Sequence, residues 1–457
     1  MASFESSVSF KSNCSSSLPP LLAAANYTTI PSPLSELTQL HNENTLLNNP
    51  SELSSWVDSL LTEFNQPGSL NNITAWNDYN TTSYCNIRQI IEEDSSIRLV
   101  HVLMSCADSV QRGTLSVASA LLEELQVLLS RVNSEFGFGK VAAYFIDALS
   151  RRVFKPLERS LGSAFENEVL YHHFYEACPY LKFAHFTSNQ AILEAFDGQP
   201  CVHVIDFNLM QGLQWPALIQ ALALRPNGPP SLRITGIGPA SLDGHDPLRE
   251  TGLRLAQLAR SVNVRFAFRG VAASNIDDVK LWMLQVDPKE AVAVNCIMQL
   301  HKLLDDPSRI DSVLKLIHSL DPKIVTLVEQ DTNQNQPDFS DKFREALDYY
   351  STMFDSLEAC KGPQKWLAEI YIQREICSVV CCAEMHEPLA QWRERMSRNG
   401  FTSVCLGANA YKQANMLLTV FSAQGGYSVD ESEGCLKLGW HNRPLIAASA
   451  WRPNPGL

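Results

Sequence analysis

The stretch CVHVIDFNLMQGLQW at residues 201–215 has the residue order of a ligand-binding turn in an α/β enzyme. An apolar run ends in Asp206, a loop with Gly212 follows, and an amphipathic stretch begins. In many α/β enzymes a nucleotide-like cofactor lies at this point, between the carboxyl end of a strand and the N-terminus of a helix. The chemistry to test here is therefore the binding of a nucleoside cofactor.

The turn lacks two features that such a cofactor needs. Backbone approach to the cofactor requires two or three glycines, whereas this loop has one and places Leu209, Met210 and Gln211 in the path. An acidic residue should end the second strand and hold the ribose, but that segment ends in Gly-Ile-Gly, which we interpret as a tight turn. We predict that no cofactor binds and that Asp206 and Asn208 hydrogen-bond the turn itself. An unrecognised small-molecule site beyond Asp206 is the alternative.

Two other groups contain residue types that could bind a metal ion. Neither has the Cys-x-x-Cys knuckle of a zinc site or the His-Glu-x-x-His order of a metalloprotease. The first group is Cys377, Cys381 and His386, and the second group is His172, His173 and Glu176. We expect the first group to be buried thiols on an apolar helix face and the second to be hydrogen-bonded polar residues of a helix. We predict no catalytic residue and no metal ion in either group.

The composition restricts the class of function. The 457 residues carry a formal net charge of −13, and 45% of them are hydrophobic. An acidic chain is poorly suited to bind the phosphate backbone, which requires clustered Lys and Arg, so direct DNA binding is not expected. No apolar run is long enough to cross a membrane and no signal peptide is recognisable, so the 12 cysteines are expected to be free thiols in a reducing compartment.

Residues 1–95 differ from the rest of the chain. They are rich in Ser, Asn, Thr and Pro and contain 2 basic against 10 acidic residues, a composition typical of a disordered arm. Within this arm a short amphipathic helix is predicted near residues 51–64, with Trp56, Leu60 and Leu61 on one face. Such a helix could bind the groove of a partner or pack on its own folded domain.

The pattern from residue 96 onward predicts a globular domain with two parts. Residues 96–200 have helical periodicity, whereas residues 201–457 alternate short β-branched runs with amphipathic stretches. Nearly continuous apolar strands alternating with helices indicate a parallel sheet covered on both faces. Three strand-like runs at the C-terminus, 427–431, 435–440 and 445–451, predict an antiparallel edge. The predicted fold is therefore α/β: a Rossmann-like, methyltransferase-like sheet of seven mostly parallel strands with an α-helical cap.

Several motifs in this domain resemble those of the plant GRAS family. The segment VHVID resembles the VHIID signature, leucine-rich helical regions lie on both sides of it, and pieces of the PFYRE motif and a closing SAW follow in the family order. The resemblance covers about residues 96–454. The residues that carry it are Val202, His203, Val204, Ile205 and Asp206, then Pro322, Tyr349, Tyr350, Arg374 and Glu375, then Ser449, Ala450 and Trp451.

Within this family the chain is most similar to the DELLA subgroup. That resemblance implies a nuclear transcriptional regulator that restrains gibberellin responses by binding transcription factors, with other GRAS proteins as further partners. Because no Asp-Glu-Leu-Leu-Ala occurs in residues 1–95, we predict a chain that lacks the DELLA motif, contacts the hormone receptor weakly or not at all, and resists hormone-triggered degradation. The alternatives are a methyltransferase-like enzyme or ligand binder that uses the cleft after Asp206, and a Scarecrow-like regulator outside gibberellin signalling.

A Leu-x-x-Leu-Leu motif in the first leucine-rich region is a candidate partner-binding edge. Leu125 and Leu129 continue the apolar stripe of Leu122 and are expected in the core, whereas Leu121 and Leu128 lie off that stripe and are the surface candidates. A second such motif lies at residues 300–304.

The positions of three further motif residues can be predicted. Arg374 and Glu375 are adjacent, so they cannot pair with each other efficiently and each is expected to meet an opposite charge elsewhere. Trp451, like Trp440, lies on a terminal strand and is expected to fix the C-terminal hairpin onto the core.

Overall fold

The computed structural model describes residues 83–154, 164–239, 246–360, 365–382, 384–421 and 425–454. Trp56, Leu60, Leu61 and the helix predicted near residues 51–64 lie outside the described residues. No helix within the described ranges is long and apolar enough to cross a membrane.

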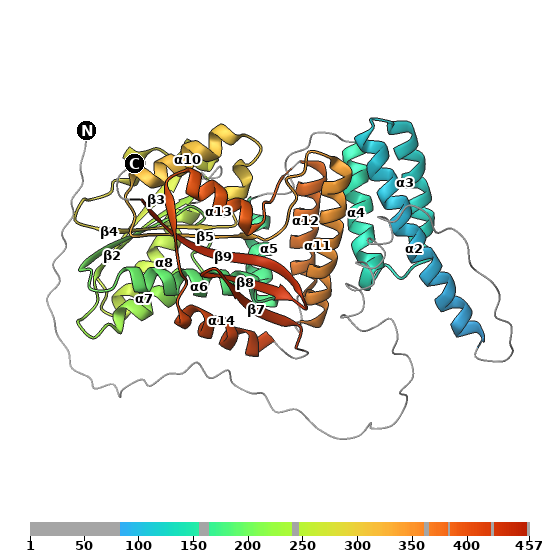
Figure 1. Cartoon of the computed structure of the whole chain (residues 1–457). Helices are drawn as coiled ribbons and strands as arrows, with labels where there is room; N and C mark the ends of the chain where they lie inside the picture. Colours follow the sequence, from blue (N-terminus) through green and yellow to red (C-terminus); the bar gives the residue numbers. More distant parts are fainter. Residues whose placement is uncertain are drawn as a thin grey trace, which may run out of the picture. The chain divides into compact units, whose positions relative to one another are not determined.

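Helices make up the first part of the described chain and return later to complete a bundle. Helix α2 begins at Ser83, before the boundary predicted at residue 96. Within the helical region predicted at residues 96–200, Cys178 and Pro179 separate two helices, α5 and α6. Contacts among α2, α3, α4, α11 and α12 form the bundle visible at one end of the sheet in Figure 1. The elements are α2 (Ser83–Gln111), α3 (Leu115–Leu129), α4 (Gly137–Phe154), α5 (Ala164–Ala177), α6 (Tyr180–Ala195), α11 (Phe339–Ala359) and α12 (Lys365–Cys381).

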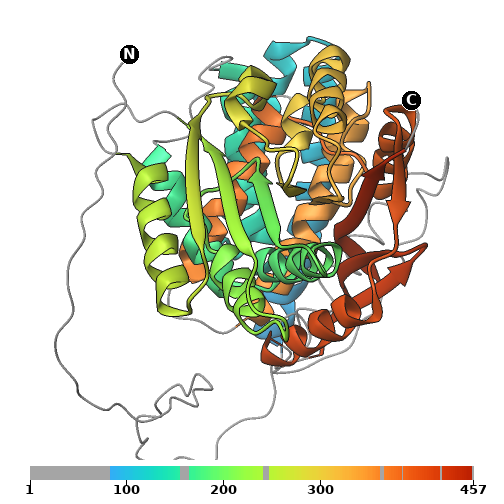
Figure 2. The same ribbon diagram turned by 90° about the vertical axis from the view of Figure 1, so that its left-hand side faces the viewer.

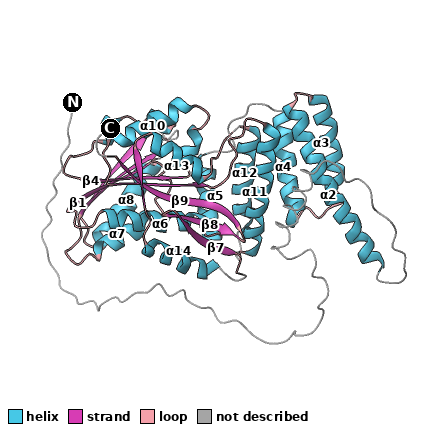
Figure 3. Ribbon diagram, in the orientation of Figure 1, coloured by secondary structure: helices cyan, strands magenta, loops and turns pink. Residues whose placement is uncertain are grey.

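A single mixed sheet follows, whose strands are drawn in magenta in Figure 3. Its strand order is β3-β2-β1-β4-β5-β9-β8-β7, and β6 pairs with β9. Strands β1 to β5 are parallel, and β6 to β9 join by antiparallel pairing. The predicted fold class is confirmed, but the prediction of seven strands is wrong, since the sheet has nine. The strands are β1 (Cys201–Asp206), β2 (Ser231–Gly238), β3 (Phe266–Ala272), β4 (Ala291–Ile297), β5 (Ile324–Gln330), β6 (Phe401–Val404), β7 (Tyr427–Ser432), β8 (Cys435–Trp440) and β9 (Arg443–Pro453).

The strands separate two apolar cores because successive side chains point to opposite faces of the sheet. Val204 belongs to the core formed with α6, α7 and α8, whereas the next residue, Ile205, belongs to the core formed with α10 and α13. Figure 2 shows helices on both sides of the strands. The remaining helices are α7 (Trp215–Ala223), α8 (Pro247–Ser261), α9 (Leu281–Leu284), α10 (Pro307–Ser319), α13 (Leu389–Arg398) and α14 (Ala408–Phe421), with short 3-10 turns η1 (Ile276–Asp278) and η2 (Leu300–Leu303).

Local sequence signals explain where the main crossover helices begin. Asp246 and Asp306 each precede a proline, and their side chains accept hydrogen bonds from the first-turn N–H groups of α8 and α10. An aspartate cap followed by proline at the first helical position satisfies a free donor and fixes the backbone for the helix. These two helices therefore begin close to the positions that the sequence pattern predicts.

The C-terminal hairpin closes through a two-residue turn between β7 and β8. Glu433 and Gly434 have φ angles of 51° and 76°, which suit the right-handed twist of a tight hairpin. Trp440 and Trp451 are buried on the adjoining strands, as predicted, and the Trp440 Nε1 donates to Asp355 Oδ2 at 2.7 Å.

Candidate functional site

The loop after β1 has its main polar groups already hydrogen-bonded. Asp206 is buried, and its two carboxylate oxygens accept hydrogen bonds from the Trp215 Nε1 at 2.9 Å and from the Asn208 backbone N–H and the Asn295 Nδ2 at 3.1 Å each. Burial raises the pKa of Asp206 to about 6, and these hydrogen bonds limit the rise. Asp206 therefore fixes the turn, as predicted, and has no free oxygen directed at a ligand.

Leu209 occupies the space above the end of β2. A Cβ atom added to Gly236 would lie 2.5 Å from the Leu209 Cδ2, so the leucine packs directly on the glycine backbone. Gly236 and Gly238 belong to β2 and pair with Gly270 and Ala272 of β3, so the interpretation of Gly-Ile-Gly as a tight turn is wrong. These glycines allow Leu209 and α8 to pack closely on β2, so their role is structural.

The other residues of the VHVID segment hold β1 in the sheet. Val202, Val204 and Ile205 are fully buried in the two cores. His203 is also buried; its Nδ1 accepts from Arg233 at 3.1 Å and its Nε2 lies 2.8 Å from the Thr235 hydroxyl. Burial and the neighbouring Arg233 lower the pKa of His203 to about 3, so the ring is neutral.

A cavity of about 590 Å³ lies beside this loop, at the carboxyl ends of the parallel strands. Segments after β1, β2, β3 and β4 line one side, and α5 and α12 line the other. This edge of an open α/β sheet is where ligands usually bind. Of the motif residues named above, Arg374 and Glu375 are among those that line the cavity.

The two adjacent residues on α12 have different surroundings. Arg374 forms an ion pair with Glu166 at 2.9 Å and a hydrogen bond with Asn167, as predicted. Glu375 forms no ion pair among the described residues, and the Gln330 Nε2 donates to its Oε2 at 3.3 Å. Burial and the nearby Glu384 raise the pKa of Glu375 to about 7. Glu375 therefore has no direct ion-pair partner among the described residues, although the nearby charges of His301 and Lys302 act to lower its pKa.

A buried polar cluster borders the same cavity and was not predicted. His301 Nδ1 lies 2.7 Å from Glu329 Oε2, and His301 Nε2 lies 2.8 Å from Glu384 Oε1. The second oxygen of Glu329 accepts backbone N–H groups at the start of η2, from Gln299, Leu300 and His301. The cluster thus links β5, η2 and the segment after α12.

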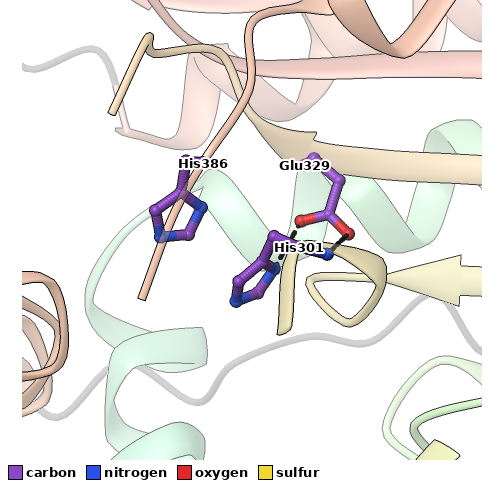
Figure 4. A group of neighbouring side chains, drawn as sticks. All are labelled: His301, Glu329 and His386. Carbon is purple, nitrogen blue, oxygen red and sulfur yellow. Dashed lines mark hydrogen bonds and ion pairs between the residues drawn. The ribbon is translucent and has the colours of Figure 1, made fainter. Parts of the chain in front are cut away.

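The geometry of this cluster favours a proton over a metal ion. Burial alone would lower the pKa of His301, but Glu329 and Glu384 outweigh it and raise the pKa to about 10, so both ring nitrogens carry hydrogen. His386 stacks on His301 with ring centroids 4.4 Å apart and planes 28° apart (Figure 4). A shared metal must lie in the plane of both rings, and nearly parallel stacked planes do not meet near the nitrogens.

The thiols predicted as buried helix residues do not join this cluster. Cys377 is buried on α12, and the partly buried Cys381 donates to the Ala148 carbonyl oxygen at 3.0 Å. His172 and His173 are partly buried on α5, and Glu176 pairs with Lys182 at 3.5 Å.

The remaining motif residues connect elements of the sheet and bundle. The Tyr349 hydroxyl donates to the Leu445 carbonyl oxygen at 2.8 Å, and the Ser449 hydroxyl donates to the Leu327 carbonyl oxygen at 3.2 Å. The Trp451 Nε1 donates to the Ser449 Oγ at 2.9 Å. Pro322, which precedes β5, and Tyr350 and Ala450 are also buried.

The leucine motif on α3 is largely inside the helical bundle. Leu125 and Leu128 are buried, and Leu121 and Leu129 are partly buried against the same core. The prediction that Leu128 lies on the surface is wrong, because α3 packs against both α2 and α4 and its apolar stripe is correspondingly wide. The second motif is also buried, at Leu300, Leu303 and Leu304.

The strand order and the packing of the turn after β1 together define an open α/β domain with a mixed sheet. The chain belongs to the GRAS domain family, whose model matches residues 99–452. SLENDER RICE1-LIKE 1 of Oryza sativa subsp. japonica is 57% identical over 376 residues, which are 80% of this chain and 76% of that protein. The DELLA protein GAI of Arabidopsis thaliana is 44% identical over 474 residues, which are 91% of this chain and 87% of that protein.

A solved structure has the same fold. The crystal structure of SCL7 in Oryza sativa superposes with a TM-score of 0.67 at 34% sequence identity, and it covers 78% of this chain and 99% of its own. These relatives confirm the prediction of a transcriptional regulator in gibberellin signalling.

The model of the DELLA N-terminal segment of transcriptional regulators matches residues 29–69. The prediction that the chain lacks the DELLA motif is therefore wrong. A search for one pentapeptide was too narrow, since a family model weighs a whole segment, here including residues 51–64. The predictions of weak receptor contact and of resistance to hormone-triggered degradation depended on that absence and lose their basis.

Proposed function

We propose that the chain acts in the nucleus by binding transcription factors through its GRAS domain, and that it has no catalytic activity of its own. The observation that carries this proposal is the filled turn after β1. Leu209 packs on Gly236, and both oxygens of Asp206 accept hydrogen bonds from the protein. The position at which a methyltransferase-like sheet would hold its cofactor is used for packing.

The charge of the chain supports contact with proteins rather than with DNA. A net charge of −13 opposes approach to the phosphate backbone, so promoter binding is proposed to pass through a partner that itself reads DNA.

Two measurements on the full chain test this proposal. Calorimetry with S-adenosylmethionine should give no binding heat, and tight binding would refute the non-enzymatic assignment. A mobility-shift assay at physiological salt should show no shift of promoter DNA by the chain alone, and a further shift of a DNA complex already formed by a partner transcription factor.

A deletion provides the matched control for the partner contact. A variant without residues 29–69 should bind the same transcription factor with unchanged affinity, because the contact is assigned to the GRAS domain, residues 99–452. Loss of that binding would place the contact in the N-terminal segment instead.

A further inference from the structure

The wall of the cavity contains a carboxyl group without a counter-ion. Glu375 on α12 lines the cavity and has no ion-pair partner among the described residues. A buried or partly buried carboxylate is normally paired or accepts several hydrogen bonds, because desolvation penalises its charge. Glu375 has one hydrogen bond of 3.3 Å, from the Gln330 side chain.

A second acceptor without a donor lies beside it. Gln330 at the end of β5 is 93% buried and lines the cavity, and its Oε1 has no hydrogen-bond partner within the described part of the chain. Buried amide oxygens are nearly always satisfied, so an unsatisfied one in a side chain that lines a cavity is a place for a donor from a ligand. Glu375 and Gln330 thus bring two acceptors to the wall of one cavity.

None of the cations around the cavity forms an ion pair with Glu375 among the described residues, although the charges of His301 and Lys302 act to lower its pKa. Arg374 is neutralised by Glu166, and Arg309 is neutralised by Asp277 at 2.9 Å. His301 is held between Glu329 and Glu384. Lys302 is exposed to solvent and forms no ion pair with a described residue. A cation in direct contact with Glu375 is therefore what the described residues do not provide.

The lining also has an apolar part. Phe207, Ile237, Leu248 and Met298 contribute side chains from the sheet edge and from α8. The volume of about 590 Å³ lies within the range of small-molecule pockets, which combine apolar walls with a few polar groups that orient the ligand.

We propose that this cavity binds a small molecule with a primary ammonium group on a compact apolar body, and that Glu375 is the anchor of the ammonium. The ammonium donates to the Glu375 carboxylate and to the Gln330 Oε1, which satisfies both acceptors at once. Charge-assisted hydrogen bonds of this kind are about twice as strong as neutral ones. This site lies beside the filled turn, whose Phe207, Asn208 and Met210 line the same cavity, and it does not depend on how the chain binds transcription factors.

Two probes with one body and opposite head groups test the proposal on the full chain. 1-Adamantylamine and 1-adamantanecarboxylate have the same apolar cage, so the difference in their affinities measures the head group alone. Ligand-observed NMR should give a dissociation constant on the order of 1 mM for the amine. The carboxylate should bind at least about ten-fold more weakly, because it meets Glu375 and Glu384.

A matched pair of variants locates the contact. Glu375→Gln should weaken binding of the amine at least about ten-fold and narrow the difference between the two probes. Glu394→Gln, which removes a carboxylate with a 69% exposed side chain on α13, should leave both affinities unchanged. A third variant, Ala273→Phe, narrows the cavity from its rim without removing a charge and should weaken the amine as well.

Several outcomes would overturn the proposal. They are absence of amine binding at several millimolar, equal binding of both probes, and full amine binding by Glu375→Gln. Thermal unfolding of each variant shows whether it is folded. If Glu375→Gln is not folded, the affinity of Ala273→Phe for the amine tests the proposal instead, and unchanged affinity would overturn it.

Discussion

The turn after β1 and the α12 wall, which is the part of α12 that lines the cavity together with Gln330, lie at the same edge of the sheet. Their polar groups differ in how many hydrogen bonds they accept. In the turn, Asp206 accepts from three donors and Leu209 fills the space above Gly236. On the wall, Glu375 has one 3.3 Å hydrogen bond and the Gln330 Oε1 has none among the described residues. One edge of the sheet therefore has two roles. The turn, whose acceptors are all hydrogen-bonded, holds the fold, and the α12 wall, whose acceptors are not all hydrogen-bonded, is where we expect a ligand to bind.

Gly236→Ala should have the largest effect on the turn. The new Cβ would lie 2.5 Å from the Leu209 Cδ2 and 2.9 Å from its Cγ, so Leu209 must move. Overpacking of this kind costs about 2 to 3 kcal/mol of unfolding free energy, measurable by urea denaturation. In a Leu209→Ala background the same substitution should cost less than half as much. Equal costs in both backgrounds would show that Leu209 does not fill the position.

Trp215→Phe should have the next largest effect. It keeps an aromatic ring at the start of α7 but removes the Nε1–H that donates to Asp206 at 2.9 Å. A buried acceptor that loses its donor costs about 1 to 2 kcal/mol of unfolding free energy, and the pKa of Asp206 should rise further above its present value of about 6. Urea denaturation at pH 7 measures the cost, and an unchanged free energy would show that the turn is not held through Asp206.

Local patterns were sufficient to predict the fold and the filled turn. Nearly continuous apolar runs between amphipathic stretches predicted β1, β2, β4 and β5, and the aspartate–proline pairs agree with the starts of α8 and α10. The four-residue strand β6 was missed because so short a segment contains almost no periodic signal. Leu128 was misplaced because the sequence does not show how many neighbours a helix has.

Neither the polar cluster around His301 nor the missing ion-pair partner of Glu375 could be predicted from the sequence. His301, Glu329, Glu384 and His386 come from three separate segments, and only the parallel pairing of β4 and β5 and the path after α12 bring them together. Their spacing matches no known ligand motif. Adjacent residues such as Arg374 and Glu375 point in different directions on a helix, and the sequence gives no sign that one direction leads to a cavity.

Glu375→Gln should have a smaller effect on stability, and one that depends on pH. Burial raises the pKa of Glu375 from 4.5 to about 7, so the folded protein holds this proton more tightly than the unfolded chain. The contribution of Glu375 to the unfolding free energy of the wild type is therefore most favourable below pH 4.5, and it falls as the pH rises from about 4.5 to about 7. The variant lacks this loss, so it should be more stable than wild type by on the order of 1 kcal/mol at pH 8 and nearly equal at pH 5.

Urea unfolding at the two pH values measures this difference in unfolding free energy. Subtracting the wild-type value from that of the variant cancels the contributions of Asp206 and Asp355, which both proteins share. Glu394→Gln is the matched control, since it also removes one carboxylate, from an exposed side chain on α13. A loss of stability at pH 8 in Glu375→Gln would mean that its carboxylate has a partner in solution.

Tyr350→Phe should have the smallest effect and forms the counterpart of Trp215→Phe. Both substitutions remove one donor from a buried aromatic side chain, but the Tyr350 hydroxyl has no hydrogen-bond partner within the described residues. Removing an unsatisfied donor should change the unfolding free energy by less than about 0.5 kcal/mol, or raise it slightly, because a desolvated polar group is lost without a bond. A cost as large as that of Trp215→Phe would mean that the hydroxyl donates a hydrogen bond in solution, and the polar groups of the α12 wall would then be as fully hydrogen-bonded as those of the turn.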